Sequence, residues 1–234
     1  MTDIAAQIAR NVATVRGRIA EAAARSGRGV DEITLVAVTK YVGRAEIRAL
    51  VEAGCRVLGE NRPQQLVAKA EALSEAPVQW HMIGHLQRNK VRRTLPVVSM
   101  VESADSPRLI AAIDRIAGEL SRRVPILLEV NVSGEAAKHG FEPEAVEPYF
   151  EELARLKHVQ VRGLMCMAGW EGGLDAARHQ FAELRQLRDR LRENCPEGIA
   201  MDQLSMGMSR DFEVAIEEGA TIIRVGSVLY EGLT

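Results

Sequence analysis

The stretch Thr34-Leu35-Val36-Ala37-Val38-Thr39-Lys40 decides the fold class of this chain. Its run of apolar residues indicates a buried β-strand, and that strand ends at a single lysine. Long cationic side chains are almost never fully buried without a partner, so this amine needs a reason to be there. A lysine desolvated at a strand end can lose its proton near neutral pH and attack a carbonyl carbon to form a Schiff base. The ordinary alternative is a surface lysine where the strand meets solvent, and position alone favours that alternative.

Strand-like runs alternate with amphipathic helical segments along the whole chain. An opening helix is expected over Ile4–Arg25, closed by Ser26 and Gly27. After the first strand, further strands are expected at 56–59, 78–83, 97–101, 126–132, 159–165, 203–206 and 221–225. Helices are expected near 45–53, 87–95, 106–120, 143–156, 174–193 and 211–218, with one more starting after Pro63. This alternation predicts parallel strands in a TIM-type (β/α)8 barrel with an extra N-terminal helix, and a doubly wound open sheet is the alternative.

The composition is that of an ordinary globular protein and excludes several classes of function. The 234 residues are 47% hydrophobic and 26% charged, and no linker or low-complexity tract divides them, so one domain over 1–234 is expected. The net charge of -2 gives no cationic surplus for nucleic acid. The three cysteines form no disulfide framework, and the sequence has no signal peptide or membrane-spanning stretch. We therefore expect a cytoplasmic protein.

Two loops after the last expected strands have the chemistry of a phosphate site. Ser205-Met206-Gly207-Met208-Ser209 and Gly226-Ser227 offer hydroxyl groups and backbone N–H groups that glycine leaves accessible. Serine and glycine are also ordinary turn residues. However, TIM barrels often bind phosphate with the loops after strands seven and eight, which are the positions of these two loops. The two loops together favour phosphate binding.

An amine and a phosphate site at the same barrel mouth indicate pyridoxal 5'-phosphate. Arg224 ends the last expected strand beside the phosphate loop, where an arginine can face the pyridine nitrogen of this cofactor. A permanently charged donor there would keep that nitrogen unprotonated. The alternative is a salt bridge from Arg224 to Glu213 or Glu217.

Several segments also carry a family resemblance, in order and over nearly the whole chain. They are Leu35-Val36-Ala37-Val38-Thr39-Lys40, Leu58-Gly59-Glu60-Asn61, Trp80-His81-Met82-Ile83-Gly84-His85-Leu86-Gln87, Lys138-His139-Gly140-Phe141, Leu204-Ser205-Met206-Gly207-Met208-Ser209 and Arg224-Val225-Gly226-Ser227. With these segments the chain resembles the pyridoxal-phosphate homeostasis protein family, the single-domain relatives of the alanine racemase N-terminal barrel.

The resemblance implies a set of cofactor contacts. These are a Schiff base at Lys40, a place beside the cofactor for Asn61, phosphate contacts from Ser205, Gly226 and Ser227, and a pyridine-side contact from Arg224. Many members carry a second lysine and a proline just past the Schiff-base lysine, whereas this chain has Tyr41-Val42-Gly43. A second binding mode that depends on that lysine is therefore in doubt here.

The resemblance implies a cofactor-binding protein of intracellular pyridoxal phosphate homeostasis, which delivers the cofactor to apo enzymes and is a monomer or weak dimer. The alternative is an amino-acid racemase-like enzyme. Racemisation needs acid–base groups on both faces of the substrate, and alanine racemase takes the second from a further domain. Only 228–234 follow the segment that ends at Ser227, which is too short for such a domain, so no catalytic residue is expected. The pair His81-x-x-x-His85 has no neighbouring cysteine and no glutamate at its second position, so no metal site is expected.

Overall fold

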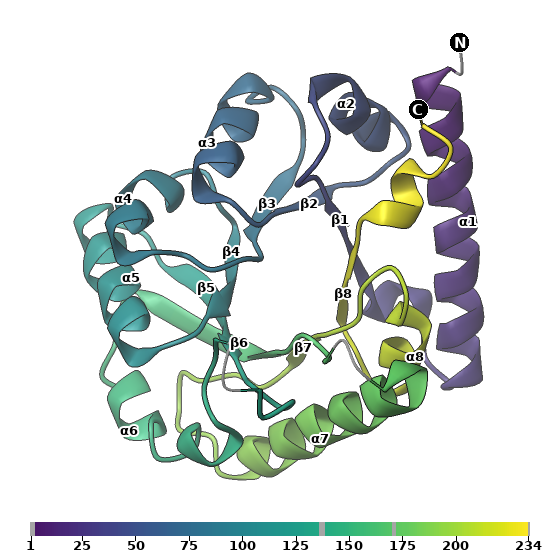
Figure 1. Cartoon of the computed structure of the whole chain (residues 1–234). Coiled ribbons are helices and arrows are strands. Elements are labelled where there is room, and N and C mark those ends of the chain that lie inside the picture. Colours follow the sequence, from purple (N-terminus) through teal and green to yellow (C-terminus); the bar gives the residue numbers. More distant parts are fainter. Residues whose placement is uncertain (1–2, 136–138, 170–171, 234) are drawn as a thin grey trace.

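A closed barrel of eight parallel strands forms the centre of the molecule in the computed structural model, which describes residues 3–135, 139–169 and 172–233 (Figure 1). The strands are β1 Thr34–Val38, β2 Val57–Glu60, β3 Gln79–Met82, β4 Met100–Ala104, β5 Val124–Glu129, β6 Val159–Met165, β7 Gln203–Ser205 and β8 Ile222–Val225. Pairing of β1 with β8, which sets Val36 opposite Arg224, closes the barrel. The predicted TIM-type barrel is thus confirmed, and the open sheet is wrong. Lys138 lies outside the described residues.

Helices surround the barrel. They are α1 Ile4–Arg25, α2 Arg44–Glu52, α3 Pro63–Ala72, α4 Val91–Thr94, α5 Pro107–Glu119, α6 Phe150–Leu153, α7 Gly173–Glu193 and α8 Phe212–Glu217, with 3₁₀ turns η1 Val30–Glu32, η2 Arg88–Lys90, η3 Pro143–Ala145 and η4 Ser227–Tyr230. No helix of the described residues has both the length and the apolar character that crossing a membrane requires.

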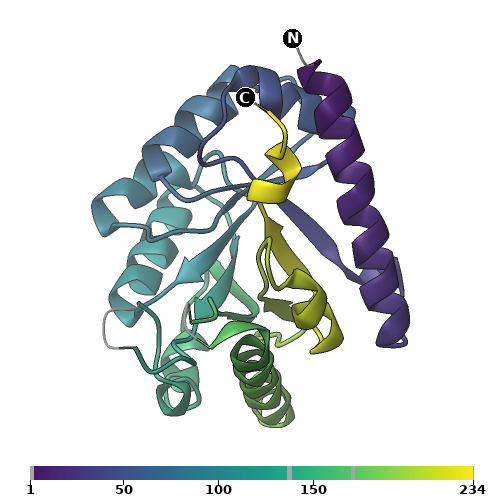
Figure 2. The same ribbon diagram turned by 45° about the vertical axis from the view of Figure 1, so that its right-hand side comes forward.

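The N-terminal helix α1 fills the place where a helix after β8 would otherwise stand. Among the described residues, the short turn η4 is the one helical element after β8, and α1 packs between α2 and α8 beside it (Figures 1 and 2). The Asp3 side chain caps α1, because its Oδ1 accepts a hydrogen bond from the Ala5 N–H at 3.0 Å. One face of the helix is then buried at helical spacing, through Ile8, Val12, Val15 and Ile19. The predicted extra helix is confirmed and completes the outer ring.

Strand alternation builds two layers inside the barrel. Met100, Leu127 and Ile222 belong to an apolar cluster inside the strands. Two residues further along the same strands stand Glu102, Glu129 and Arg224, all buried. Because residues i and i+2 of a strand face the same side, these polar residues also face the interior, nearer the carboxyl ends of the strands. The interior therefore has a lower layer that is apolar and an upper layer, at the carboxyl ends of the strands, that is polar.

The fourth strand differs most from its prediction. It was expected at 97–101 and is found at Met100–Ala104, so Glu102 and Ser103 lie in the strand and not in the loop after it. The apolar run 97–101 gave the wrong strand boundaries because Val98 packs into the core before the strand begins. The fifth strand ends at Glu129, three residues before its predicted end. The helices expected at 87–95 and 143–156 are each a 3₁₀ turn followed by a four-residue helix.

Gly163 in β6 tests the close approach of β6 and β7. Its φ is +155°, and a Cβ there would lie 1.9 Å from the Gln203 carbonyl oxygen. We expect Gly163→Ala to lower the free energy of unfolding by about 3 kcal/mol or more, because backbone strain and overpacking add. Urea unfolding followed by circular dichroism measures the change.

The matched control is Gly17→Ala in α1, where a Cβ would meet no atom within 4 Å. This variant should gain about 0.5–1 kcal/mol, because alanine favours helix over glycine. Equal stability of the two variants would contradict the tight β6–β7 contact.

Candidate functional site

A buried network of charged and polar groups lies in the upper layer of the barrel. Arg224, 3% exposed, donates to the Cys166 carbonyl at 2.9 Å and to Ser205 Oγ. Ser205 Oγ in turn donates to Glu102 Oε2 at 2.6 Å, and Arg224 Nη1 lies 3.8 Å from the same oxygen. The other oxygen, Glu102 Oε1, is 2.6 Å from His81 Nδ1. Every oxygen and nitrogen named here therefore has a partner.

The electrostatics of this network keep Glu102 ionised. Burial alone raises the pKa of the Glu102 carboxyl, but the His81 hydrogen bond and the charges of His81 and Arg224 outweigh it and lower the pKa below its ordinary value. The salt bridge considered for Arg224 thus exists with a different partner. Glu213 pairs with Arg18, and Glu217 pairs with Arg25 and Arg178.

Lys40 lies in the turn just beyond β1 and is exposed. Its Nζ is 5.1 Å from the centroid of the Tyr41 ring, and that ring is itself 83% exposed. The predicted amine is therefore at the carboxyl end of the first strand, as expected, but it is open to solvent. Val38, the last residue of β1, faces the barrel interior, and Lys40 lies two residues further on at the mouth.

Glu60 fixes the backbone around Lys40 and Asn61. Its fully buried carboxylate accepts from Lys69 Nζ at 2.6 Å, and the same Nζ donates to the Thr39 carbonyl at 2.7 Å. The other carboxylate oxygen accepts the N–H of Asn61 at 2.8 Å. One carboxylate thus holds the residue before Lys40, through Lys69, and the residue that follows β2.

Asn61 has an unused acceptor. Its Oδ1 is buried and has no hydrogen-bond partner among the described residues. The residue packs tightly against Gly84, where a Cβ would lie 2.5 Å from the Asn61 carbonyl oxygen. A buried oxygen without a donor costs free energy, so this position suits a donor group of a bound molecule.

The loops after β7 and β8 meet each other beside β1. Ser209 Oγ accepts the N–H of Gly226 at 3.0 Å, which joins the two loops. A Cβ on Gly226 would lie 3.3 Å from Val38 Cβ, and the Tyr230 hydroxyl donates to the Val38 carbonyl at 2.8 Å. Ser227, exposed, starts the turn η4, and the first N–H groups of such a turn have no partner within it. This corner offers several donors to an anion.

The structure brings four of the six predicted contacts together at the rim. Lys40, Asn61 and the pair Gly226–Ser227 follow β1, β2 and β8, which are neighbours in the barrel. Arg224 and Ser205 lie deeper. The Ser205 hydroxyl is already bound to Glu102 and Arg224, which differs from the phosphate contact predicted for it.

Sequence reasoning missed the residues that support the rim. Glu102 and Glu60 were not recognised as anchors, although each is a glutamate within an apolar strand run. Ser209 was predicted as part of the phosphate loop, but its hydrogen bond to the Gly226 N–H, which joins the two loops, was not foreseen. The two histidines of His81-x-x-x-His85 have different partners, because His81 contacts Glu102 whereas His85 contacts Asp105.

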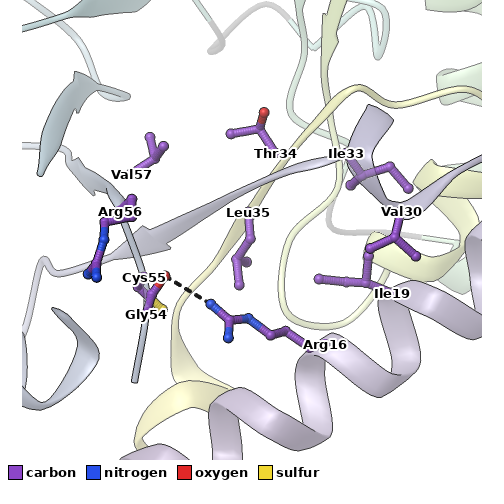
Figure 3. A pocket seen from close by; sticks show the side chains of 10 residues that line it. All are labelled: Arg16, Ile19, Val30, Ile33, Thr34, Leu35, Gly54, Cys55, Arg56 and Val57. Atoms are coloured by element: carbon purple, nitrogen blue, oxygen red, sulfur yellow. Dashed lines mark hydrogen bonds between the residues drawn. The ribbon is translucent and has the colours of Figure 1, made fainter. Parts of the chain in front are cut away.

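A cavity of about 300 Å³ lies at the other end of the barrel (Figure 3). It is lined by residues of α1 and by the beginnings of β1 and β2, among them Leu35 and Cys55. Arg16 crosses it and donates to the Gly54 carbonyl at 2.9 Å, as the dashed line in Figure 3 marks. Because Lys40 and Gly226 lie at the carboxyl ends of their strands, this cavity is not part of the predicted site.

The chain is similar to known proteins over nearly its whole length. The family model for the alanine racemase N-terminal domain matches residues 6–233. The pyridoxal phosphate homeostasis protein of Aquifex aeolicus is 41% identical over 213 residues, which cover 91% of this chain and 92% of the relative. The protein of the same name from Pseudomonas aeruginosa is 39% identical and covers 95% and 94%. The structure of PipY from Synechococcus elongatus with pyridoxal phosphate bound has a TM-score of 0.84 and 35% identity, and covers 95% and 99%.

Removing the charge of Glu102 tests the buried network. We expect Glu102→Gln to lower the free energy of unfolding by about 3–5 kcal/mol, because the buried Arg224 guanidinium loses its counter-ion. The matched control is Asp202→Asn, which breaks the exposed pair with Arg162 and should cost about 1 kcal/mol or less. Equal losses in urea unfolding would show that Arg224 does not depend on Glu102.

Glu129 gives the fold a pH dependence. Burial first, and then the Asp105 charge, raise the pKa of Glu129 to about 7 against the opposing effects of Arg224 and His85. An unfolded chain releases this proton near pH 4.5, so the folded state binds more protons between about pH 4.5 and 7. The stability due to this group therefore falls as pH rises through that window, by on the order of 2–3 kcal/mol. We expect Glu129→Gln to remove this fall in urea unfolding between pH 5 and 8, whereas parallel curves for variant and wild type would contradict it.

Proposed function

The chain belongs to the family of pyridoxal phosphate homeostasis proteins, its barrel matches the alanine racemase N-terminal domain, and we propose that it binds pyridoxal 5'-phosphate and serves the homeostasis of this cofactor. One observation carries the proposal. A primary amine, an unpartnered buried acceptor and two donor-rich loops stand on neighbouring strand ends at one mouth of the barrel. The PipY relative whose structure has pyridoxal phosphate bound supports the choice of ligand.

Each group of this mouth has a role in the proposal. When bound, the cofactor supplies an aldehyde that condenses reversibly with a primary amine and releases water. Lys40 provides that amine and holds the cofactor as a Schiff base. Ser227 and the Ser209 hydroxyl donate to the phosphate, Gly226 lets the backbone approach it closely, and Asn61 lies beside the cofactor and accepts through its free Oδ1. Arg224 is the fixed cation of the pyridine side, and Ser205 acts by holding Arg224 in place.

The exposure of Lys40 favours loading and release over catalysis. An exposed amine on a backbone held by Glu60 and Lys69 exchanges its cofactor readily, whereas catalysis on amino acids profits from a closed site without water. The names of the curated relatives are those of homeostasis proteins, not enzymes. We therefore favour a carrier over a racemase-like enzyme.

The proposal extends to the setting in which the protein acts. We place it in the cytoplasm, because its three cysteines form no disulfide, and we treat residues 1–234 as one domain. Recipients are apo enzymes that need pyridoxal phosphate, and the carrier is a monomer or weak dimer. The second lysine of many relatives is replaced by Val42, so Lys40 is the amine for both loading and release.

Covalent loading tests the central step. We expect the wild-type protein mixed with pyridoxal phosphate to gain a visible absorbance band, and borohydride to fix the cofactor on the peptide that contains Lys40. Lys40→Ala should lower both signals to background. The matched control is Lys157→Ala, an exposed lysine just before β6 at the opposite end of the barrel, which should load like wild type.

Two outcomes would contradict the proposal. Labelling that survives Lys40→Ala would move the Schiff base to another lysine, and a protein that cannot be loaded at all would exclude cofactor binding. Loaded protein incubated with L-alanine separates the carrier from the enzyme. Steady formation of D-alanine would favour the enzyme, whereas slow release of cofactor without product supports the carrier.

A further inference from the structure

A second cluster of side chains stands at the same mouth but on other strands. His85 follows β3, Asp105 follows β4, and His139 lies in the segment after β5, so three successive loops contribute to it. His85 Nδ1 is 2.7 Å from Asp105 Oδ2, and the His85 and His139 rings stack with centroids 4.3 Å apart. One ligand atom from each residue lies within 4.8 Å of the others. None of the three belongs to the proposed cofactor contacts.

We propose that His85, Asp105 and His139 bind a divalent transition-metal ion of the Zn²⁺ class. Two imidazole nitrogens and one carboxylate oxygen form the ligand type that zinc sites use when a fourth position is left to water. This donor set suits Zn²⁺ better than Mg²⁺ or Ca²⁺, which prefer oxygen ligands alone. The site is formed from loops that are far apart in sequence, and for this reason the spacing of His81 and His85 did not reveal it.

The carboxylate is the fixed member of the cluster. Asp105 is 8% exposed, and its second oxygen accepts from Ser106 Oγ at 2.9 Å. The segment of His139 is attached at its other end, because Phe141 donates to the Glu129 carbonyl at 2.7 Å and accepts from the Asn131 N–H at 2.9 Å.

The two imidazoles have room to complete the geometry. Tetrahedral ligands at ordinary Zn–N and Zn–O distances lie roughly 3.3 Å apart. The widest separation in the cluster, at most 4.8 Å, exceeds this by about 1.5 Å. The His85 side chain is 46% exposed and His139 is exposed, so rotation of these two rings out of their stack closes the gap without moving the barrel.

Metal titration of the full-length protein tests the proposal. The protein is freed of cofactor and treated with a chelator, and Co²⁺ is then added while its visible absorption is followed. We expect one equivalent of Co²⁺ to bind and one equivalent of Zn²⁺ to displace it. His85→Ala and His139→Ala should each weaken binding at least tenfold, and Asp105→Asn should do the same.

Controls separate this site from other causes of binding. His179→Ala removes an exposed histidine of α7 and should leave the affinity unchanged. Lys40→Ala should also bind Co²⁺ like wild type, which keeps the outcome independent of cofactor loading. If Asp105→Asn fails to fold, the two variants at the solvent-accessible histidines decide.

The proposal is overturned if no stoichiometric Co²⁺ binding occurs, because the cluster would then be a hydrogen-bonded and stacked pair only. It is also overturned if His85→Ala and His139→Ala, with unchanged circular dichroism, bind Co²⁺ as tightly as wild type. Loss of binding in His179→Ala would assign the ion to the surface of α7 instead.

Discussion

The buried ion pair of Arg224 and Glu102 is the constraint on which the rest of the site depends. A guanidinium cannot lose its proton inside a protein, so an arginine that is 3% exposed must be paired and hydrogen-bonded. Glu102 supplies the charge, while Ser205 and the Cys166 carbonyl supply the remaining contacts. These requirements turn the upper layer of the barrel from apolar to polar. The floor of the mouth is therefore a fixed cation, the Arg224 guanidinium. Groups on three other strands or strand ends set its orientation.

A second buried carboxylate does the same for the rim. Glu60 accepts from Lys69 and from the backbone of Asn61, and Lys69 also holds the Thr39 carbonyl. Replacing either partner would leave a buried charge alone, so the backbones that carry Lys40 and Asn61 are held to one geometry. The Lys40 side chain itself stays free. A rigid base under a free amine is the arrangement that reversible attachment of a ligand needs, because loading requires only a rotation of one side chain.

The difference between local and long-range information explains what the sequence predicted. The barrel, the helix α1 and the rim residues Lys40, Gly226 and Ser227 followed from patterns within a few residues, since strand ends and glycine turns are local features. The network could not be found in this way, because Ser205 and Glu102 are 103 residues apart in the chain. The β4 boundary failed for a related reason. A glutamate inside a strand resembles a loop residue until its buried partner is known.

Charge divides the mouth of the barrel into two halves. The ends of β7, β8 and β1 present an amine and hydrogen-bond donors, whereas the ends of β3, β4 and β5 present Asp105, Glu129 and two imidazoles. Arg224 lies beneath both and acts on the carboxyl groups of the second half, but it does not cancel the effect of burial at Glu129. An anion is thus drawn to the first half and a cation to the second. This division follows from which inward strand positions carry charge, and a phosphate and a metal ion would therefore occupy separate places in one opening.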